Sequence, residues 1–212
     1  MIQRRFPRLA VLAHCAVLTA ALSATAVQAA DPAAPAPARG PLVSLVDTAP
    51  PGGFFGYWGF DVFAEQSVGA RFTVPAEADH RLVRVGIWFM NNTDTRQGKL
   101  RLSLQTDALD EGGSETMPSG RKLATWVAPV EALGWNPVEQ FFSGLRNKLP
   151  TLKAGRHYWV VAESASPALV NPVWTTASEG SMVTTTTANG AWQTAGEGAA
   201  LTLQVDALPV AN

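Results

Sequence analysis

A short alternation of apolar and polar residues recurs along most of the chain and constrains the fold more than any other feature. It is clearest in residues 99–105, where Leu100, Leu102 and Leu104 alternate with polar or charged side chains. Successive side chains of a β-strand point to opposite faces, so this pattern is typical of a strand that is buried on one face. No long stretch after Leu42 keeps a helical period, and we therefore predict an all-β domain.

The same alternation predicts strands elsewhere. In residues 81–89, Val83, Val85, Ile87 and Phe89 share one face and Trp88 lies on the other. Further strands are expected at 69–74, 121–128, 138–143, 157–163, 170–175, 181–187 and 201–205. Turns are expected at 110–113, 118–120, 154–155 and 189–190, which are rich in glycine. Many short strands with regular turns indicate an antiparallel two-sheet β-sandwich of the jelly-roll type.

The first 29 residues have the layout of a secretory signal peptide. Arg4, Arg5 and Arg8 precede an apolar run, and Val27 and Ala29 stand at the small-residue positions that signal peptidase requires. We predict that residues 1–29 are removed and that the protein is exported to the periplasm or beyond, with no membrane span after cleavage. The alternatives are an uncleaved anchor and a lipoprotein modified at Cys15; the export route is open. Cleavage would remove the only cysteine, so no disulfide is expected.

After the signal, residues 30–41 form a Pro/Ala-rich linker that favours extended conformations over packing. Residues 42–212 are expected to fold as a single β-sandwich domain. A formal net charge of −1 and a pI near 6.3 argue against nucleic acid as a partner. The oligomeric state is open.

Several motifs follow one another in a familiar order. They include Phe72-Thr73-Val74-Pro75, Leu102-Ser103-Leu104-Gln105-Thr106-Asp107 and Leu152-Lys153-Ala154-Gly155-Arg156-His157-Tyr158-Trp159-Val160-Val161. Over about residues 70–206 this order resembles the secreted jelly-roll modules of bacterial surface proteins of the choice-of-anchor type. The resemblance implies the fold and an association with the cell surface. Its motifs concern packing and turns, and they include no catalytic residue.

Aromatic residues are the main candidates for a binding surface. By strand parity Trp88 lies opposite Val85, Ile87 and Phe89, and Trp126 lies with Lys122, opposite Leu123 and Val127. Outward rings on a β-sandwich suit the C–H faces of sugars or a protein partner. The ligand-binding candidates are Tyr57, Trp58, Trp88, Trp126 and Trp135. The alternative for each ring is burial under loops.

Four carboxylates gather in one predicted loop. Asp107, Asp110, Glu111 and Glu115 supply the hard oxygen ligands that Ca²⁺ prefers, although their spacing fits no EF-hand. A structural calcium site is therefore one interpretation, and a solvated acidic loop without a metal or other cofactor is the other.

These observations predict an exported, non-catalytic β-sandwich that binds a glycan or a surface protein. One alternative is a structural component of the cell envelope. Another is a glycoside hydrolase that uses carboxylates around Asp61, Asp107 or Asp110, because such enzymes place two carboxylates across a cleft.

Overall fold

The computed structural model describes residues 40–48, 59–91, 98–130, 134–144, 148–165, 172–178, 183–186, 190–195 and 200–210. Contacts divide the chain into two units, Met1–Ala38 and Arg39–Asn212, and every described residue belongs to the second. The predicted signal peptide, Tyr57 and Trp58 lie outside the described residues.

The described residues form strands and one short 3-10 helix, η1 (Leu109–Glu111), with no α-helix among them. The strands are β1 (Val43–Asp47), β2 (Gly59–Asp61), β3 (Val68–Thr73), β4 (His80–Asn91), β5 (Lys99–Asp107), β6 (Pro118–Pro129), β7 (Gly134–Ser143), β8 (Thr151–Leu152), β9 (His157–Ser164), β10 (Pro172–Thr175), β11 (Val183–Thr186), β12 (Trp192–Thr194) and β13 (Leu203–Pro209). The predicted all-β class is confirmed.

In the part of the chain that the structure describes, no helix is long and apolar enough to span a membrane.

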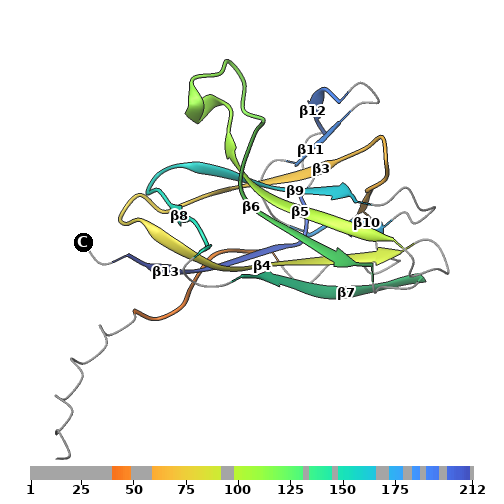
Figure 1. Cartoon of the computed structure of the whole chain (residues 1–212), viewed down its shortest axis with the longest axis horizontal. Coiled ribbons are helices and arrows are strands. Elements are labelled where there is room, and N and C mark those ends of the chain that lie inside the picture. Colours follow the sequence, from red (N-terminus) through yellow and green to blue (C-terminus); the bar gives the residue numbers. More distant parts are fainter. Residues whose placement is uncertain are drawn as a thin grey trace, which may run out of the picture. The chain divides into compact units, whose positions relative to one another are not determined.

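The strands form two antiparallel sheets, which Figure 1 shows as two layers. The first sheet has the order β1-β13-β4-β10-β2, and β7 and β8 pair with the other edge of β4. The second sheet has the order β12-β11-β3-β9-β5-β6. The two-sheet sandwich is therefore as predicted, and β4 is the strand that contacts most of the first sheet.

The core lies between the sheets and is filled by the alternating residues of both. Val85, Ile87 and Phe89 of β4 and Leu102 and Leu104 of β5 belong to one buried apolar cluster. Burying such side chains contributes about 1.5–3 kcal/mol each, so this alternation is the main source of stability.

The structure corrects three details of the strand predictions. Leu82 lies in the core in place of Val83, because the pairing of β4 with β13 skips Val83 between Arg84 and Leu82. The expected turn at 118–120 is the start of β6, where Gly120 has a positive φ of 81° and the pairing register with β5 shifts. Residues 99–105 are not simply half-buried, because Ser103 and Gln105 on the other face are also buried. Four short strands, β1, β2, β8 and β12, were not predicted. β2, β8 and β12 have only two or three residues, and the register of β1 shifts between Ser44 and Val46, which breaks its alternation.

Candidate functional site

The outward face of the first sheet brings several of the polar and aromatic side chains together. On β4, Arg84, Gly86 and Trp88 alternate with the buried core residues and therefore face outward. Their cross-strand neighbours on β7 and β13 share that face because directly paired residues of antiparallel strands point to the same side. We call this set the outer patch; its members are Arg84, Trp88, Glu139, Phe141, Gln204 and Asp206.

Trp88 stands where β4 changes partner. Ile87 pairs with Leu203 of β13, whereas Phe89 pairs with Trp174 of β10. At the junction, the carbonyl oxygen of Trp88 accepts hydrogen bonds from Oγ1 of Thr175 at 3.0 Å and Oγ1 of Thr202 at 3.2 Å. Neither β13 nor β10 supplies a paired residue for Trp88 on this edge of β4. The two buried threonines satisfy its backbone instead and fix its position.

Phe141 lies across the middle of the patch. It pairs with Gly86, and a Cβ atom on Gly86 would stand 2.7 Å from Cε1 of the Phe141 ring. The ring can occupy this place only because residue 86 has no side chain. The Cζ atom of Arg84 lies 4.1 Å from the ring centroid, and 41% of Phe141 is exposed. The patch therefore presents an aromatic side chain held by a cation–π contact.

Carboxylates surround Arg84 on this face. Its Nε donates to Oδ2 of Asp206 at 2.5 Å, and the amide nitrogen of Gln204 lies 3.2 Å from each Asp206 carboxylate oxygen. Burial raises the pKa of Glu139 above its ordinary value of 4.5; the charge of Arg84 opposes this shift, and Asp47 and Asp206 add to it. The patch thus carries more negative charge than Arg84 neutralises.

This arrangement can bind a ligand that combines an apolar face with hydroxyl groups. Two aromatic side chains offer surface for C–H groups, while a carboxylate, an amide and a guanidinium offer planar hydrogen-bonding groups. The chemistry is suited to recognition, since the same groups recur in small-molecule sites that fix the orientation of a ligand.

The predicted aromatic candidates have different outcomes. The outward orientation of Trp88 is confirmed, and its side chain is half-buried. Trp135 lies in β7, but its side chain is outside the described residues, as are Tyr57 and Trp58.

The outward orientation predicted for Trp126 is wrong. Its ring packs against the core, 6.3 Å from the ring of Phe142, and its Nε1 donates to the carbonyl oxygen of Ser143 at 3.0 Å. Leu104 pairs with Ala124 but Gln105 pairs with Lys122, so one extra residue in β6 breaks the alternation. Val127, expected to face the core, is 54% exposed.

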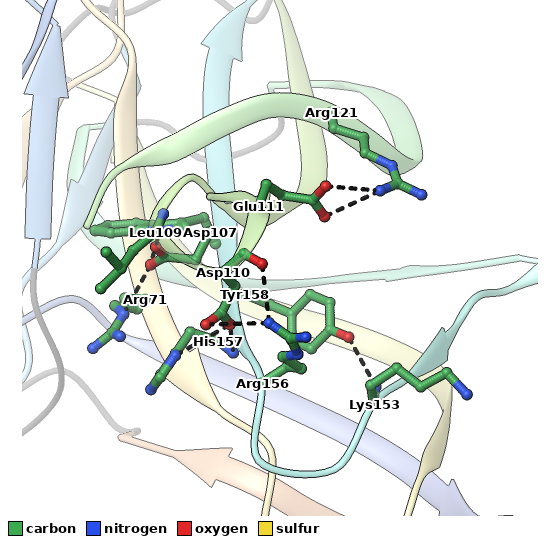
Figure 2. A network of polar contacts seen from close by, with 11 residues as sticks. Arg71, Asp107, Leu109, Asp110, Glu111, Arg121, Lys153, Arg156, His157 and Tyr158 are labelled. Carbon is green, nitrogen blue, oxygen red and sulfur yellow. Dashed lines mark hydrogen bonds and ion pairs between the residues drawn. The ribbon is translucent and has the colours of Figure 1, made fainter. Parts of the chain in front are cut away.

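The acidic loop is held by ion pairs and hydrogen bonds, as Figure 2 shows. Asp107 is buried, and its Oδ2 accepts hydrogen bonds from Nε of Arg71 at 3.1 Å and Nε1 of Trp159 at 2.8 Å. Its Oδ1 accepts the backbone N–H of Leu109 at 2.9 Å. The carboxylate of Asp107 therefore anchors the start of the loop.

The other three carboxylates have separate surroundings. Asp110 accepts the backbone N–H of His157 at 2.7 Å and lies 3.2 Å from Nδ1 of that ring. Glu111 accepts two hydrogen bonds from Nη1 of Arg121 at 3.0 Å, and Glu115 is exposed. Within the described ranges, no group of three or more His, Cys, Asp or Glu side chains could hold a metal ion. The structure therefore does not bring the four predicted metal ligands together around one centre.

The hydrolase candidates have different environments. Asp61 lies in β2, at the edge of the first sheet, whereas Asp107 ends β5 of the second sheet and Asp110 follows it in η1. Burial alone would raise the pKa of Asp110, but hydrogen bonds and charge from His157, together with the charge of Arg156, lower it overall. A lowered pKa is the opposite of what a general acid in glycoside hydrolysis requires.

Sequence reasoning missed Glu139, Phe141, Gln204 and Asp206 as members of a site. Alternation within 138–143 and 201–205 does predict which residues share a face of each strand. It does not indicate that β7 and β13 lie on opposite edges of β4, and this pairing assembles the patch.

Comparisons with known proteins add no assignment: no family model matches this sequence, and no curated protein shows significant similarity to it.

Proposed function

We propose that this protein is an exported, non-catalytic module that binds carbohydrate through the outer patch. The supporting observation is the placement of Trp88 and Phe141 on one sheet face, with Glu139 paired directly with Trp88. Sugar rings present C–H groups on their faces and hydroxyl groups at their edges. A surface with aromatic rings beside planar polar groups complements both.

The charge of the patch favours a neutral sugar over an acidic one. Glu139, Asp206 and the nearby Asp47 outnumber Arg84, and the charges of Asp47 and Asp206 add to the burial that raises the pKa of Glu139. An anionic ligand would meet repulsion here, whereas sugar hydroxyls can donate hydrogen bonds to Glu139; Asp206 is buried and adds only its charge. The proposed ligand is therefore a neutral glycan of the cell surface or its surroundings.

The test is a glycan array probed with the purified protein and with the variants Trp88→Ala and Phe141→Ala. The matched control is Trp192→Ala, because Trp192 is half-buried on β12 in the other sheet. We expect binding to neutral glycans that falls by about tenfold or more in both patch variants, since a stacked ring is worth on the order of 1.4 kcal/mol. The control should keep its binding.

Two outcomes would overturn the proposal. Binding to no glycan would leave the envelope-component alternative as the better explanation. Binding that survives both patch substitutions would place the glycan elsewhere on the molecule. Circular dichroism and thermal melting of each variant separate a lost contact from a lost fold.

A glycoside hydrolase is the second candidate, and the raised pKa of Glu139 favours it. A general acid must stay protonated near the working pH, and burial, with the charges of Asp47 and Asp206 adding to it, favours the protonated form of Glu139. Release of reducing sugar from an array-positive glycan, abolished in Glu139→Gln, would replace the binding proposal with an enzymatic one.

A further inference from the structure

A pocket of about 390 Å³ lies at the ends of β5, β6, β8 and β9, and nothing in the outer patch accounts for it. Its lining carries three basic side chains, Arg121, Lys153 and Arg156, and two carboxylates, Asp110 and Glu111. Its wall includes Tyr158 and Leu123. The volume is within the range of about 300–1,000 Å³ in which proteins hold small ligands. Figure 2 shows Arg121, Lys153, Arg156 and Tyr158 together with Glu111 and Asp110.

The three cations are available to a ligand. Their side chains are 64%, 65% and 54% exposed for Arg121, Lys153 and Arg156 respectively. Each contacts one carboxylate of the chain: Glu111, Asp79 and Asp110, in the same order. Ion pairs as exposed as Arg121–Glu111 contribute little to stability, so an incoming anion can share or replace them at small cost.

Both guanidinium groups have donors to spare. Arg121 contacts Glu111 through Nη1 alone, and Arg156 donates through Nη1 to the carbonyl oxygen of Asp110 at 3.0 Å. Toward the other described residues, Nε and Nη2 of both groups make no hydrogen bond. A guanidinium binds a carboxylate best through two parallel N–H groups, and these atoms can supply them.

The rest of the pocket suits the body of a sugar. The hydroxyl of Tyr158 accepts the backbone N–H of Lys153 at 2.8 Å, and its ring is stacked on Phe72 at 5.8 Å, so the wall is rigid. Thr106 and Thr151 add hydroxyl groups to the lining. A bare inorganic anion would fill only part of the volume, whereas a monosaccharide that carries a carboxylate would use both the rim and the wall.

We propose that this pocket binds an acidic sugar, with the carboxylate held by Arg121 and Arg156 and the sugar ring lying toward Tyr158 and Leu123. The site is separate from the outer patch and has the opposite preference for charge. The two sites together would let one domain hold a neutral and an acidic glycan residue.

The test is calorimetric titration of the whole protein with D-glucuronate, with D-glucose as the uncharged counterpart and inorganic phosphate as the bare oxyanion. We expect glucuronate to bind and to lose about tenfold or more in affinity in Arg121→Gln and in Arg156→Gln, as charge-assisted hydrogen bonds are lost. Glu111→Gln should bind glucuronate at least as tightly as the native chain, because it removes the competing carboxylate.

The matched control is Lys122→Gln. Lys122 is the neighbour of Arg121 on β6, but it pairs with Glu163 and does not line the pocket. This variant should bind glucuronate normally, and so should Trp88→Ala, which keeps failure of this site distinct from failure of the outer patch. Equal binding of glucose, binding of phosphate alone, no binding of glucuronate, or unchanged affinity in both arginine variants would each overturn the proposal.

Discussion

The guanidinium carbon of Arg84 lies 4.1 Å from the centroid of the Phe141 ring, and the same side chain donates a hydrogen bond to Asp206. Arg84 therefore links β4 to β7 through a cation–π contact and to β13 through a carboxylate. Three strands that are distant in sequence are joined at the surface by one side chain. This explains why a partly exposed aromatic residue keeps a defined position on the outer patch.

Gly86→Ala should disturb Phe141. The added Cβ would meet the ring at 2.7 Å, so the ring must leave its place beside Arg84. We expect a loss of about 1 kcal/mol or more in the free energy of unfolding and weaker glycan binding, measured by urea denaturation and on the array. Gly40→Ala is the control, since its Cβ would make only ordinary contacts, the nearest at 3.7 Å.

Trp126→Ala and Trp88→Ala should differ in their effect on stability. Trp126 is partly buried, but its ring packs against the core and donates a hydrogen bond to Ser143, so its truncation should cost up to about 3 kcal/mol. Trp88 is half-buried on the outer face, and its truncation should cost less while it weakens binding. Thermal melting of both variants measures the difference; equal losses of stability would contradict the assignment of Trp88 to a binding surface.

Asp107→Asn should be strongly destabilising. The buried carboxylate accepts hydrogen bonds from Arg71, Trp159 and Leu109, and the substitution leaves the Arg71 charge without its partner. Breaking such a pair costs about 3–5 kcal/mol. Denaturant unfolding would show this, with the exposed Glu115→Gln as the neutral comparison. A loss below about 1 kcal/mol would show that the pair does not anchor the loop.

Glu139→Gln should raise stability at about pH 7 and lose that advantage in acid. Folding raises the pKa of Glu139. Its contribution to the free energy of unfolding is therefore fully present below the ordinary pKa of 4.5 and is lost as the pH rises through the raised pKa, where the carboxyl becomes charged. Glutamine keeps the shape without the charge. Because the side chain is partly exposed, the gain should stay below about 1 kcal/mol, measured as melting temperature against pH.

Chelation should leave the melting temperature unchanged. Asp107, Asp110 and Glu111 each contact a basic side chain of the chain itself, and these contacts replace the ion that their clustering in sequence suggested. Thermal melting with EDTA and with added calcium checks this. A rise in melting temperature on adding calcium would restore the metal interpretation of the loop.

The alternating residues of 81–89 and 99–105 were enough to predict an all-β sandwich and the outward side of Trp88, because the period of a strand is local. The same reasoning was wrong for Trp126, since one extra residue in β6 inverts the alternation after it. A bulge leaves little trace in a sequence, because it depends on the register of the neighbouring strand.

Local sequence determined which residues are strand-forming, which share a face, and that charge is balanced overall. The tertiary structure alone decided that β7 and β13 flank β4, which places Phe141 and Asp206 beside Arg84. It also decided that Arg71, Arg121 and His157 contact the acidic loop. Strand order and register depend on contacts between residues far apart in the chain, and a pattern that is read along one strand carries no information about which strand lies beside it.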